Sequence, residues 1–194
     1  MGVVALYFTT RIFICDSFIV SGPSMEPTFN DRERVMAFKT GIGARIYTKY
    51  NFADPKLHSF RMPGLRKLRR GDVAVFNYPY GAYPGTISFK INYVLIKRCA
   101  GAPGDTVQLD GLEPCYVPAQ GDRIILDSAN VVRYSRQIEF ETGMPPEVGG
   151  EHTFSTDWFF FIGDNFKHSR DSRHFGLVPE SYIVGRVRQK RSPN

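Results

Sequence analysis

Lys97 is the residue of this chain best placed to act as a base in hydrolytic chemistry. A serine hydrolase needs a nucleophilic hydroxyl, a base within its reach and hydrogen-bond donors for the oxyanion. The sequence has no Gly-x-Ser-x-Gly turn, and its four histidines stand in no familiar triad pattern. A lysine can replace histidine when burial among apolar neighbours keeps its amine neutral, since its ordinary pKa is about 10.4. Lys97 follows the apolar run 93–96 and meets that requirement.

The composition is that of an ordinary globular protein and favours neither a metal nor an organic cofactor. Of the 194 residues, 42% are hydrophobic and 23% are charged, which argues against wholesale disorder. The three cysteines, Cys15, Cys99 and Cys115, include no Cys-x-x-Cys pair. They therefore exclude a dense disulfide framework and offer no metal-binding spacing. Cys99 and Cys115 would pair only if the fold brought them together, and two buried free thiols are the favoured interpretation.

Lys97 lies near the end of the longest predicted strand. Residues 87–99 alternate, so that Leu95 and Lys97 share one side of this strand. A tight turn follows at 101–105, and residues 106–109 are predicted to return as a second strand. The two strands would make a hairpin.

The other segments predict a mostly-β fold. Eighteen glycines, thirteen prolines and many aromatic residues favour strands and turns over helices. Further short strands are expected at residues 18–22, 34–38, 73–76 and 158–162. One helix is expected at 127–141, with Asp127 or Ser128 as its N-cap. We predict coiled antiparallel or mixed sheets with a smaller inserted β lobe and at most one or two short helices.

The N-terminus and two basic clusters leave alternatives open. Residues 1–14 are apolar but interrupted by Arg11, and a transmembrane helix needs roughly 20 apolar residues. The segment fits either the end of a membrane anchor or a buried N-terminal strand or helix. The net charge of +6 comes largely from residues 61–70 and 186–191, which suit an anionic membrane surface or are solvated loops. No nucleic-acid-binding signature accompanies them, so no nucleic-acid partner is expected.

Four segments resemble the sequence boxes of bacterial type I signal peptidases, the leader peptidases of the S26 family. Residues Ser21–Phe29 resemble the nucleophile box, and Gly71–Phe76 resemble the third box. Tyr93–Asp105 resemble the lysine box, and Gly163–Gly176 the last box. The boxes stand in the family's order over residues 18–178, which is most of the chain.

The resemblance implies a serine–lysine dyad. Ser24 would attack the scissile carbonyl, and Lys97 would take its proton and later return one to the leaving amine. Ser169 would orient the lysine amine by a hydrogen bond. The oxyanion would be held by the Ser24 N–H and one further donor. Some members use a serine hydroxyl two residues before the nucleophile, where this chain has Gly22, and Ser21 is a less favourable substitute. A supporting ion-pair network would consist of Arg98, Asp164, Asp171 and Arg173.

The resemblance also implies that the substrate binds as an added strand between residues 18–22 and 94–97. Two shallow pockets would accept alanine-like residues at the cleavage site and two residues upstream, an Ala-x-Ala pattern. The residues expected to bind substrate are Phe18, Val20, Gly22, Met25, Phe29, Leu95 and Ile96.

The family's substrates are signal peptides of exported preproteins, which arrive inserted in the membrane. We therefore expect residues 1–14 to be the end of a membrane anchor in contact with lipid. The catalytic domain of a monomeric enzyme would lie on the outer, periplasmic face of the inner (cytoplasmic) membrane. Residues 61–70 would then reach anionic headgroups. Trp158–Phe161 would form a buried strand or an interfacial contact.

The predicted domain layout divides the catalytic core into two parts. Residues 15–109, with an excursion over the surface at 40–70, form its first part, and residues 158–188 form its last. An inserted peripheral lobe at 110–157 separates them, and 189–194 form a basic tail.

Three other interpretations compete. Self-cleaving repressors share the serine–lysine chemistry, but they carry a DNA-binding domain ahead of the serine. A specialised peptidase of conjugative transfer systems has similar boxes. A catalytically inactive, membrane-attached β module that binds peptides is the alternative from outside the enzymes.

Overall fold

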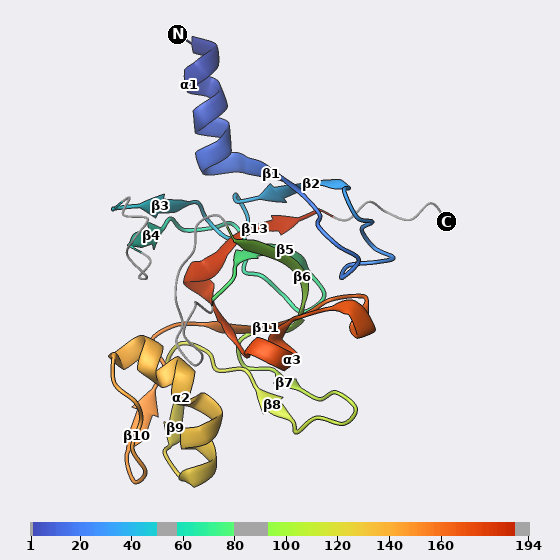
Figure 1. Ribbon diagram of the computed structural model, residues 1–194. Coiled ribbons are helices and arrows are strands. Elements are labelled where there is room, and N and C mark those ends of the chain that lie inside the picture. The colour runs from blue at the N-terminus through green and yellow to red at the C-terminus, as the bar shows by residue number, and fades with distance from the viewer. Residues whose placement is uncertain (1, 50–57, 80–92, 189–194) are drawn as a thin grey trace.

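A curled antiparallel sheet of seven strands forms the body of the protein (Figure 1). The structure is a computed structural model that describes residues 2–49, 58–79 and 93–188. The strand order is β1-β2-β13-β5-β6-β11-β12. The strands are β1 (Cys15–Ile19), β2 (Arg34–Phe38), β5 (Val73–Asn77), β6 (Val94–Gly101), β11 (Trp158–Ile162), β12 (Val178–Pro179) and β13 (Ile183–Val187). The prediction of a mostly-β fold is confirmed.

Smaller elements surround this sheet. Three two-stranded sheets pair β3 (Arg45–Tyr47) with β4 (Ser59–Arg61), β7 (Thr106–Val107) with β8 (Cys115–Tyr116), and β9 (Arg123–Ile125) with β10 (Glu151–Thr153). The α-helices are α1 (Gly2–Thr9), α2 (Ser128–Thr142) and α3 (Ser172–Phe175). Shorter helical turns are the π-helical η1 (Thr10–Ile14) and the 3₁₀ turns η2 (Phe166–His168) and η3 (Glu180–Tyr182).

Strand β5 is buried on both faces and holds the body together. Val73 and Val75 enter one apolar cluster, whereas Ala74 and Phe76 enter another on the opposite face. This split follows from the two-residue period of a strand. The Phe76 ring stacks on Phe161 of β11 with 4.4 Å between ring centroids. Its neighbour β6, which carries Lys97, is thereby fixed between two buried strands.

Several predicted elements are confirmed. Strands 34–38 and 158–162 occur with the predicted bounds, and α2 is capped by the Asp127 carboxylate, which accepts from the Asn130 N–H. The first strand begins three residues before Phe18 and ends at Ile19. Part of the predicted strand 87–99 lies outside the described residues, and its described part is β6.

The predicted hairpin between residues 87–99 and 106–109 is wrong. Strand β6 pairs with β5 and β11, and β7 pairs with β8 instead. The turn is present, with the Asp105 N–H bonded to the Ala102 carbonyl. The apolar strand β11 takes the edge of β6 that the hairpin would have used, because Phe160 and Phe161 bury their side chains there. The alternation of apolar and polar residues within one segment cannot show which of two strands will pair with β6.

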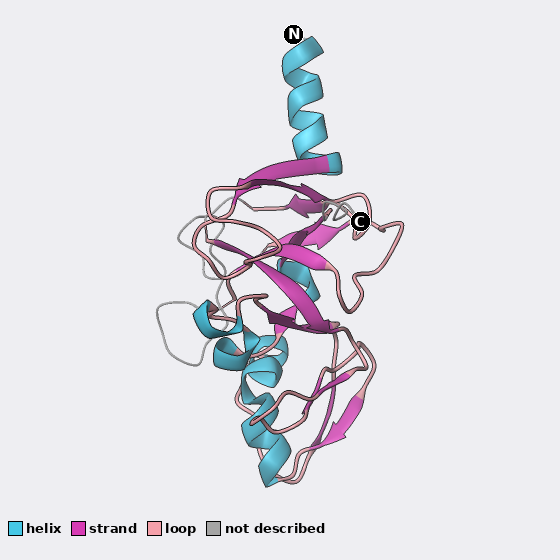
Figure 2. Cartoon of the chain, turned by 90° about the vertical axis from the view of Figure 1, so that its right-hand side faces the viewer, coloured by secondary structure: helices cyan, strands magenta, loops and turns pink. Residues whose placement is uncertain are grey.

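A second lobe lies at the end of the molecule opposite α1 (Figure 2). Helix α2 and the strand pairs β7–β8 and β9–β10 surround a third apolar cluster, which includes Tyr134, Phe154 and Trp158. The lobe contains more helix than the predicted β lobe, because α2 is 15 residues long. Trp158 is fully buried, so the interfacial alternative for Trp158–Phe161 is wrong and the buried strand is confirmed.

The segment 40–70, predicted to be an excursion over the surface, packs partly against the main sheet. Its described residues include the β3–β4 hairpin and buried Ile42 and Leu68. The Arg61 guanidinium donates to the carbonyls of Gly43, Glu180 and Ile183. Arg61 is thus withdrawn from solvent and is not available for the expected contact of residues 61–70 with anionic headgroups.

The N-terminal segment projects from the body as a helix (Figure 1). Val3, Leu6 and Phe8 are 83%, 67% and 57% exposed. The alternative of a buried N-terminal element is therefore wrong. Among the described residues, no helix has both the length and the apolar character that crossing a bilayer requires.

Candidate active site

Ser24 lies in a tight turn after strand β1. The turn begins at Gly22, whose φ of +82° is readily adopted only by glycine. Inside the turn, the Glu26 N–H donates to the Pro23 carbonyl, and Met25 is completely buried. The Ser24 carbonyl accepts from the Asn165 N–H at 3.1 Å. The backbone on both sides of the hydroxyl is therefore held by the core and by the loop after β11.

Lys97 reaches Ser24 from strand β6. The Lys97 Nζ donates to the Ser24 Oγ at 2.6 Å, although the two residues are 73 positions apart in the chain. Lys97 is only 3% exposed, and its neighbours along the strand, Ile96 and Arg98, point to the other face. The structure thus brings the predicted nucleophile and base into direct hydrogen-bond contact.

The surroundings of Lys97 favour its neutral form. Burial lowers the pKa of Lys97 from 10.5 to about 8, although the carboxylates of Asp171 and Asp164 act in the opposite direction. Desolvation outweighs these charges because each carboxylate is engaged by an arginine. A substantial fraction of Lys97 is therefore an amine with a free lone pair at mildly alkaline pH.

Ser169 lies beside the dyad with a buried hydroxyl. Its Oγ makes no hydrogen bond of normal geometry to a described residue, although it lies near enough to the Asp171 carboxylate to help lower the pKa of that group. Gly163 explains the close approach: a Cβ at this position would overlap both the Ser169 side chain and the Ser24 carbonyl oxygen. Gly163 therefore permits Ser169 and the Ser24 turn to pack against the same point of the backbone. A buried hydroxyl without such a bond is able to bind a polar group that changes during a reaction.

The four predicted supporting residues form two bidentate ion pairs. Arg98 donates to Asp164 at 2.7 and 2.6 Å, and Arg173 donates to Asp171 at 2.8 Å through two nitrogens. Asp171 also accepts from the Gly163 N–H at 2.9 Å. Burial favours protonation of Asp171, but these hydrogen bonds prevail and lower its pKa. Both carboxylates stay ionised and fix the loop that carries Ser169.

One donor for an oxyanion is present at the nucleophile. Among the described residues, the Ser24 N–H has no acceptor. The Gly22 N–H is already engaged, since it donates to the Asp31 carboxylate at 2.7 Å. Gly22 therefore contributes the shape of the turn, and neither its N–H nor a side chain is available as a second donor.

The expected pocket residues fall into two groups. Val20, Met25, Phe29 and Ile96 are buried in the apolar cluster beneath the Ser24 turn. Phe18 and Leu95 are partly exposed at the edges of β1 and β6. Only this second group has substantially exposed apolar surface in the observed conformation.

Three contacts at the site had no predicted role. Asn165 holds the Ser24 carbonyl through its backbone, Asp31 holds Gly22, and the Thr28 hydroxyl accepts from Arg98 at 3.3 Å. Thr28 and Asn165 stand inside the motifs that resemble the peptidase boxes, which is the only signal the sequence offers for them. Asp31 lies outside these motifs and carries no signal.

The described residues contain no group of three or more potential metal ligands. Cys99 and Cys115 are free thiols, and burial raises the pKa of Cys99 to about 12. Cys99 is therefore protonated and inert at neutral pH.

Comparisons with known proteins identify the family of this chain. The sequence profile of the family described as signal peptidase, peptidase S26, matches residues 1–190. Signal peptidase I of Pseudomonas aeruginosa is 26% identical over 209 residues, which span 95% of this chain and 67% of that protein. Signal peptidase I of Rickettsia bellii is 29% identical, spanning 94% and 68%. Signal peptidase IB of Staphylococcus aureus is 28% identical, spanning 94% and 80%.

The profile match covers nearly the whole chain, including the Ser24 turn, strand β6 and the Ser169 loop. The chain therefore belongs to the peptidase S26 family, the signal peptidases, which are serine endopeptidases that remove signal peptides from preproteins.

Proposed function

We propose that this protein cleaves signal peptides with a serine–lysine dyad, in which Ser24 is the nucleophile and Lys97 the general base. The observation that carries the proposal is the 2.6 Å hydrogen bond between the Lys97 Nζ and the Ser24 Oγ. Lys97 is almost fully buried, which is the condition for a lysine to act as a base near neutral pH.

In the acylation step, the Ser24 oxygen attacks the scissile carbonyl carbon while neutral Lys97 takes the hydroxyl proton. The Ser24 N–H donates to the oxyanion that forms. The intermediate collapses when the peptide C–N bond breaks and the Lys97 ammonium gives its proton to the leaving amine. The signal peptide is then an ester on Ser24.

Deacylation repeats the same proton transfers with water. Lys97 takes a proton from a water molecule that attacks the ester, and the ammonium returns this proton to the Ser24 oxygen as the ester bond breaks. Ser169 is the candidate that holds the Lys97 amine in line during both steps, because its buried hydroxyl lies beside the Ser24 turn and makes no hydrogen bond of normal geometry to a described residue.

The substrate would bind as a strand between β1 and β6. Strand β1 is the terminal strand of the sheet, and among the described residues its outer edge has no strand partner. Among the described residues, positions 94–97 of β6 pair only with β5, since β11 pairs with the later residues 98–101. Two open backbone edges therefore lead to the dyad, and an extended peptide can hydrogen-bond to them.

We expect small residues at the cleavage site and two residues upstream. The residues beneath the Ser24 turn are closely packed core, so little depth is available for a substrate side chain there. Leu95, which is partly exposed near Lys97 on β6, would contact these side chains. Cleavage of peptides with bulky residues at both positions, at the rate found for an Ala-x-Ala site, would contradict this expectation.

The exposed apolar helix α1 supports a membrane location. Val3, Leu6 and Phe8 present their side chains to the surroundings beyond the body of the protein. Covering such a surface with lipid is favourable, by about 25 cal/mol per Å² of apolar area. We propose that α1 contacts the inner membrane with the catalytic body on its outer face, where exported preproteins emerge.

The test is cleavage of a preprotein with an Ala-x-Ala site in detergent. Wild type should cleave it, and Ser24→Ala and Lys97→Ala should each lose at least about a thousandfold in kcat/KM. Lys67→Ala is the matched control, since Lys67 is 84% exposed and should keep full activity. Equal activity of wild type and Lys97→Ala would contradict the dyad. Binding of the preprotein without cleavage would favour the peptide-binding module instead.

A further inference from the structure

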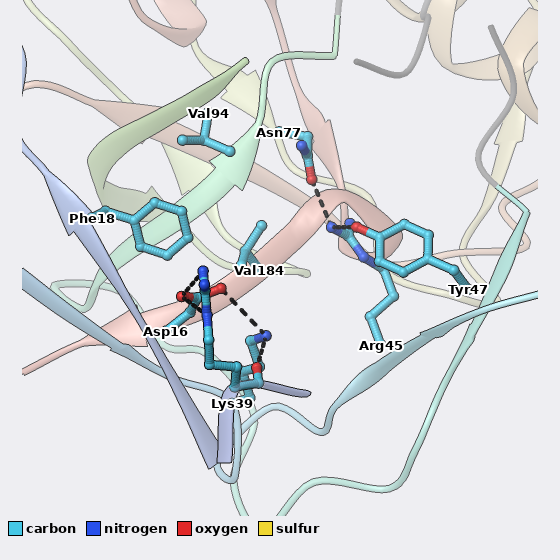
Figure 3. Close-up of a pocket in the computed structure, with 9 residues that line it drawn as sticks. Asp16, Phe18, Lys39, Arg45, Tyr47, Asn77, Val94 and Val184 are labelled. Atoms are coloured by element: carbon cyan, nitrogen blue, oxygen red, sulfur yellow. Dashed lines mark hydrogen bonds and ion pairs between the residues drawn. The ribbon is translucent and has the colours of Figure 1, made fainter. Parts of the chain in front are cut away.

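A pocket of about 440 Å³ opens on the side of the body near the base of the N-terminal helix (Figure 3). Its wall combines apolar and charged side chains: Arg11, Asp16, Phe18, Lys39, Arg45, Tyr47, Asn77, Val94 and Val184. None of these residues belongs to the dyad or to its two supporting ion pairs.

Two strands connect this pocket with the dyad. Phe18 of β1 lies six residues before Ser24, and Val94 of β6 lies three residues before Lys97. The two strands converge at the dyad, because Lys97 bonds to Ser24. A strand rises about 3.3 Å per residue, so Val94 is roughly 10 Å along β6 from Lys97. The pocket is therefore the upstream end of the cleft that the proposed substrate strand would occupy.

The spacing selects one substrate position. Side chains of an extended peptide alternate between two faces, so those at the cleavage site, two residues upstream and four residues upstream point the same way. Counting back from the scissile bond, these are positions −1, −3 and −5. Position −5 lies about 13 Å from position −1, about one residue beyond the level of Val94 in the pocket wall.

The charged end of the pocket has an ammonium with capacity for another acceptor. The Lys39 Nζ donates to the Arg11 carbonyl and lies 4.0 Å from the Asp16 carboxylate. Asp16 is already bound by two nitrogens of the Arg11 guanidinium. Two cations thus share one carboxylate, and of the three Lys39 donors only one has an acceptor among the described residues.

The electrostatic surroundings of Lys39 also leave its positive charge incompletely compensated. Burial lowers the pKa of Lys39, and although Asp16 opposes this, Arg45 and Arg11 lower it further. The Lys39 side chain is 14% exposed, so its ammonium is largely desolvated but still reachable from the pocket. A negatively charged ligand group would accept a charge-assisted hydrogen bond from the Lys39 ammonium and offset its positive charge.

We propose that this pocket is a subsite for substrate position −5 and that it favours Asp or Glu there, with the carboxylate held by Lys39. The inference rests on the proposed function, because it places the substrate strand between β1 and β6. Phe18 and Val94 would enclose the methylene groups of the side chain, and a basic residue at −5 would be repelled.

The test compares acetylated Ala-x-Ala peptides that differ only at position −5. Glu should give about tenfold higher kcat/KM than Lys, mainly through KM, as expected for one charge-assisted hydrogen bond. In Lys39→Met this ratio should fall to near one. Arg34→Met, which removes an exposed charge at the start of β2, the strand that Lys39 follows, should preserve it. The same Glu and Lys exchange at position −4, on the opposite face of the peptide, should have no effect.

Each contrary outcome is distinct. Equal cleavage of the −5 Glu and −5 Lys peptides by wild type, or a ratio that Lys39→Met leaves unchanged, overturns the subsite and leaves the dyad intact. If the −5 preference appears only when anionic vesicles are present, the cations of the pocket bind lipid headgroups. That result also overturns the subsite. Failure to cleave the parent Ala-x-Ala peptide overturns the proposed function itself. Because the ratio compares two peptides on one protein, partial misfolding of a variant cannot imitate the predicted result.

Discussion

Lys97 stands at a buried position where an ammonium ion is poorly solvated. Its pKa falls from 10.5 in the unfolded chain to about 8 in the folded protein. Below pH 8 both states carry the proton, and the folded state is destabilised by about 3 kcal/mol. Between pH 8 and 10.5 the unfolded chain binds more protons, so stability rises with pH in this window. The arrangement that activates the lysine therefore weakens the fold.

Replacement of Lys97 by methionine, of similar length, should stabilise the protein while abolishing activity. At pH 7 we expect the free energy of unfolding to rise by up to about 3 kcal/mol, because the buried charge is removed. The gain should shrink as the pH is raised from 8 to 10.5. Urea denaturation at pH 7 and at pH 10 measures both effects. Lys49→Met, at an exposed lysine, should show neither, and a loss of stability in Lys97→Met at pH 7 would contradict the account.

At the scale of residues, the sequence predicts side chains better than backbone contacts. Lys97 could be found because a lysine after four apolar residues is unusual, and Ser24 because its surroundings resemble a nucleophile box. The contact of the Asn165 N–H with the Ser24 carbonyl involves only main-chain atoms. Any residue except proline could make it, so no side-chain pattern reveals it.

At the scale of elements, the turn after β11 holds the turn that carries Ser24, the proposed nucleophile. Gly163 begins this turn, and its missing side chain leaves room for the Ser24 carbonyl and for Ser169. Gly163→Ala should therefore displace the Ser24 turn and lower kcat by at least about a hundredfold, since small misplacements of reacting groups have effects of that size. Preprotein cleavage measures the loss.

Gly150→Ala is the matched control for this change. An added Cβ there would meet only a side-chain carbon of Leu126 at 3.8 Å, an ordinary contact. Activity should be unchanged. If Gly163→Ala folds and keeps wild-type kcat, the packing of the turn does not position Ser24.

Some of the elements were predicted from local patterns, but others, among them β13, and the strand partners were not. The uninterrupted apolar run 158–162 predicts a strand, and the N-cap residue Asp127 predicts the start of a helix. The pairing of β13 between β2 and β5 joins segments more than a hundred residues apart, and nothing in their composition specifies it. The role of Arg61 depends on the carbonyls of the η3 turn, which only the folded chain brings near.

At the scale of the whole molecule, the apolar helix and the α2 lobe lie at opposite ends (Figures 1 and 2). The body between them carries the dyad and the pocket, and the pocket opens toward the base of the helix. If α1 contacts the bilayer, the proposed substrate cleft begins close to the membrane surface. This order fits a substrate that is drawn from the membrane toward the dyad.

Serine substitutions at Val3, Leu6 and Phe8 should abolish flotation of the protein with liposomes. The physical reason is the loss of apolar surface that lipid would cover. The control is a triple serine variant of exposed apolar residues elsewhere on the body and lobe: Leu65, Val132 and Val148. This control should float as wild type does, and both variants should cleave a soluble peptide normally. Undiminished flotation of the N-terminal variant would contradict the membrane role of α1.

The pH dependence of kcat/KM for an acetylated Ala-x-Ala peptide tests the dyad most directly. Such a profile reports the ionisation of the essential base in the free enzyme. We predict that activity rises through an apparent pKa of about 8, the value of buried Lys97, because only the neutral amine accepts the Ser24 proton. A profile that rises near 6.5, where histidine titrates, or that stays flat from pH 6 to 9, would contradict Lys97 as the base.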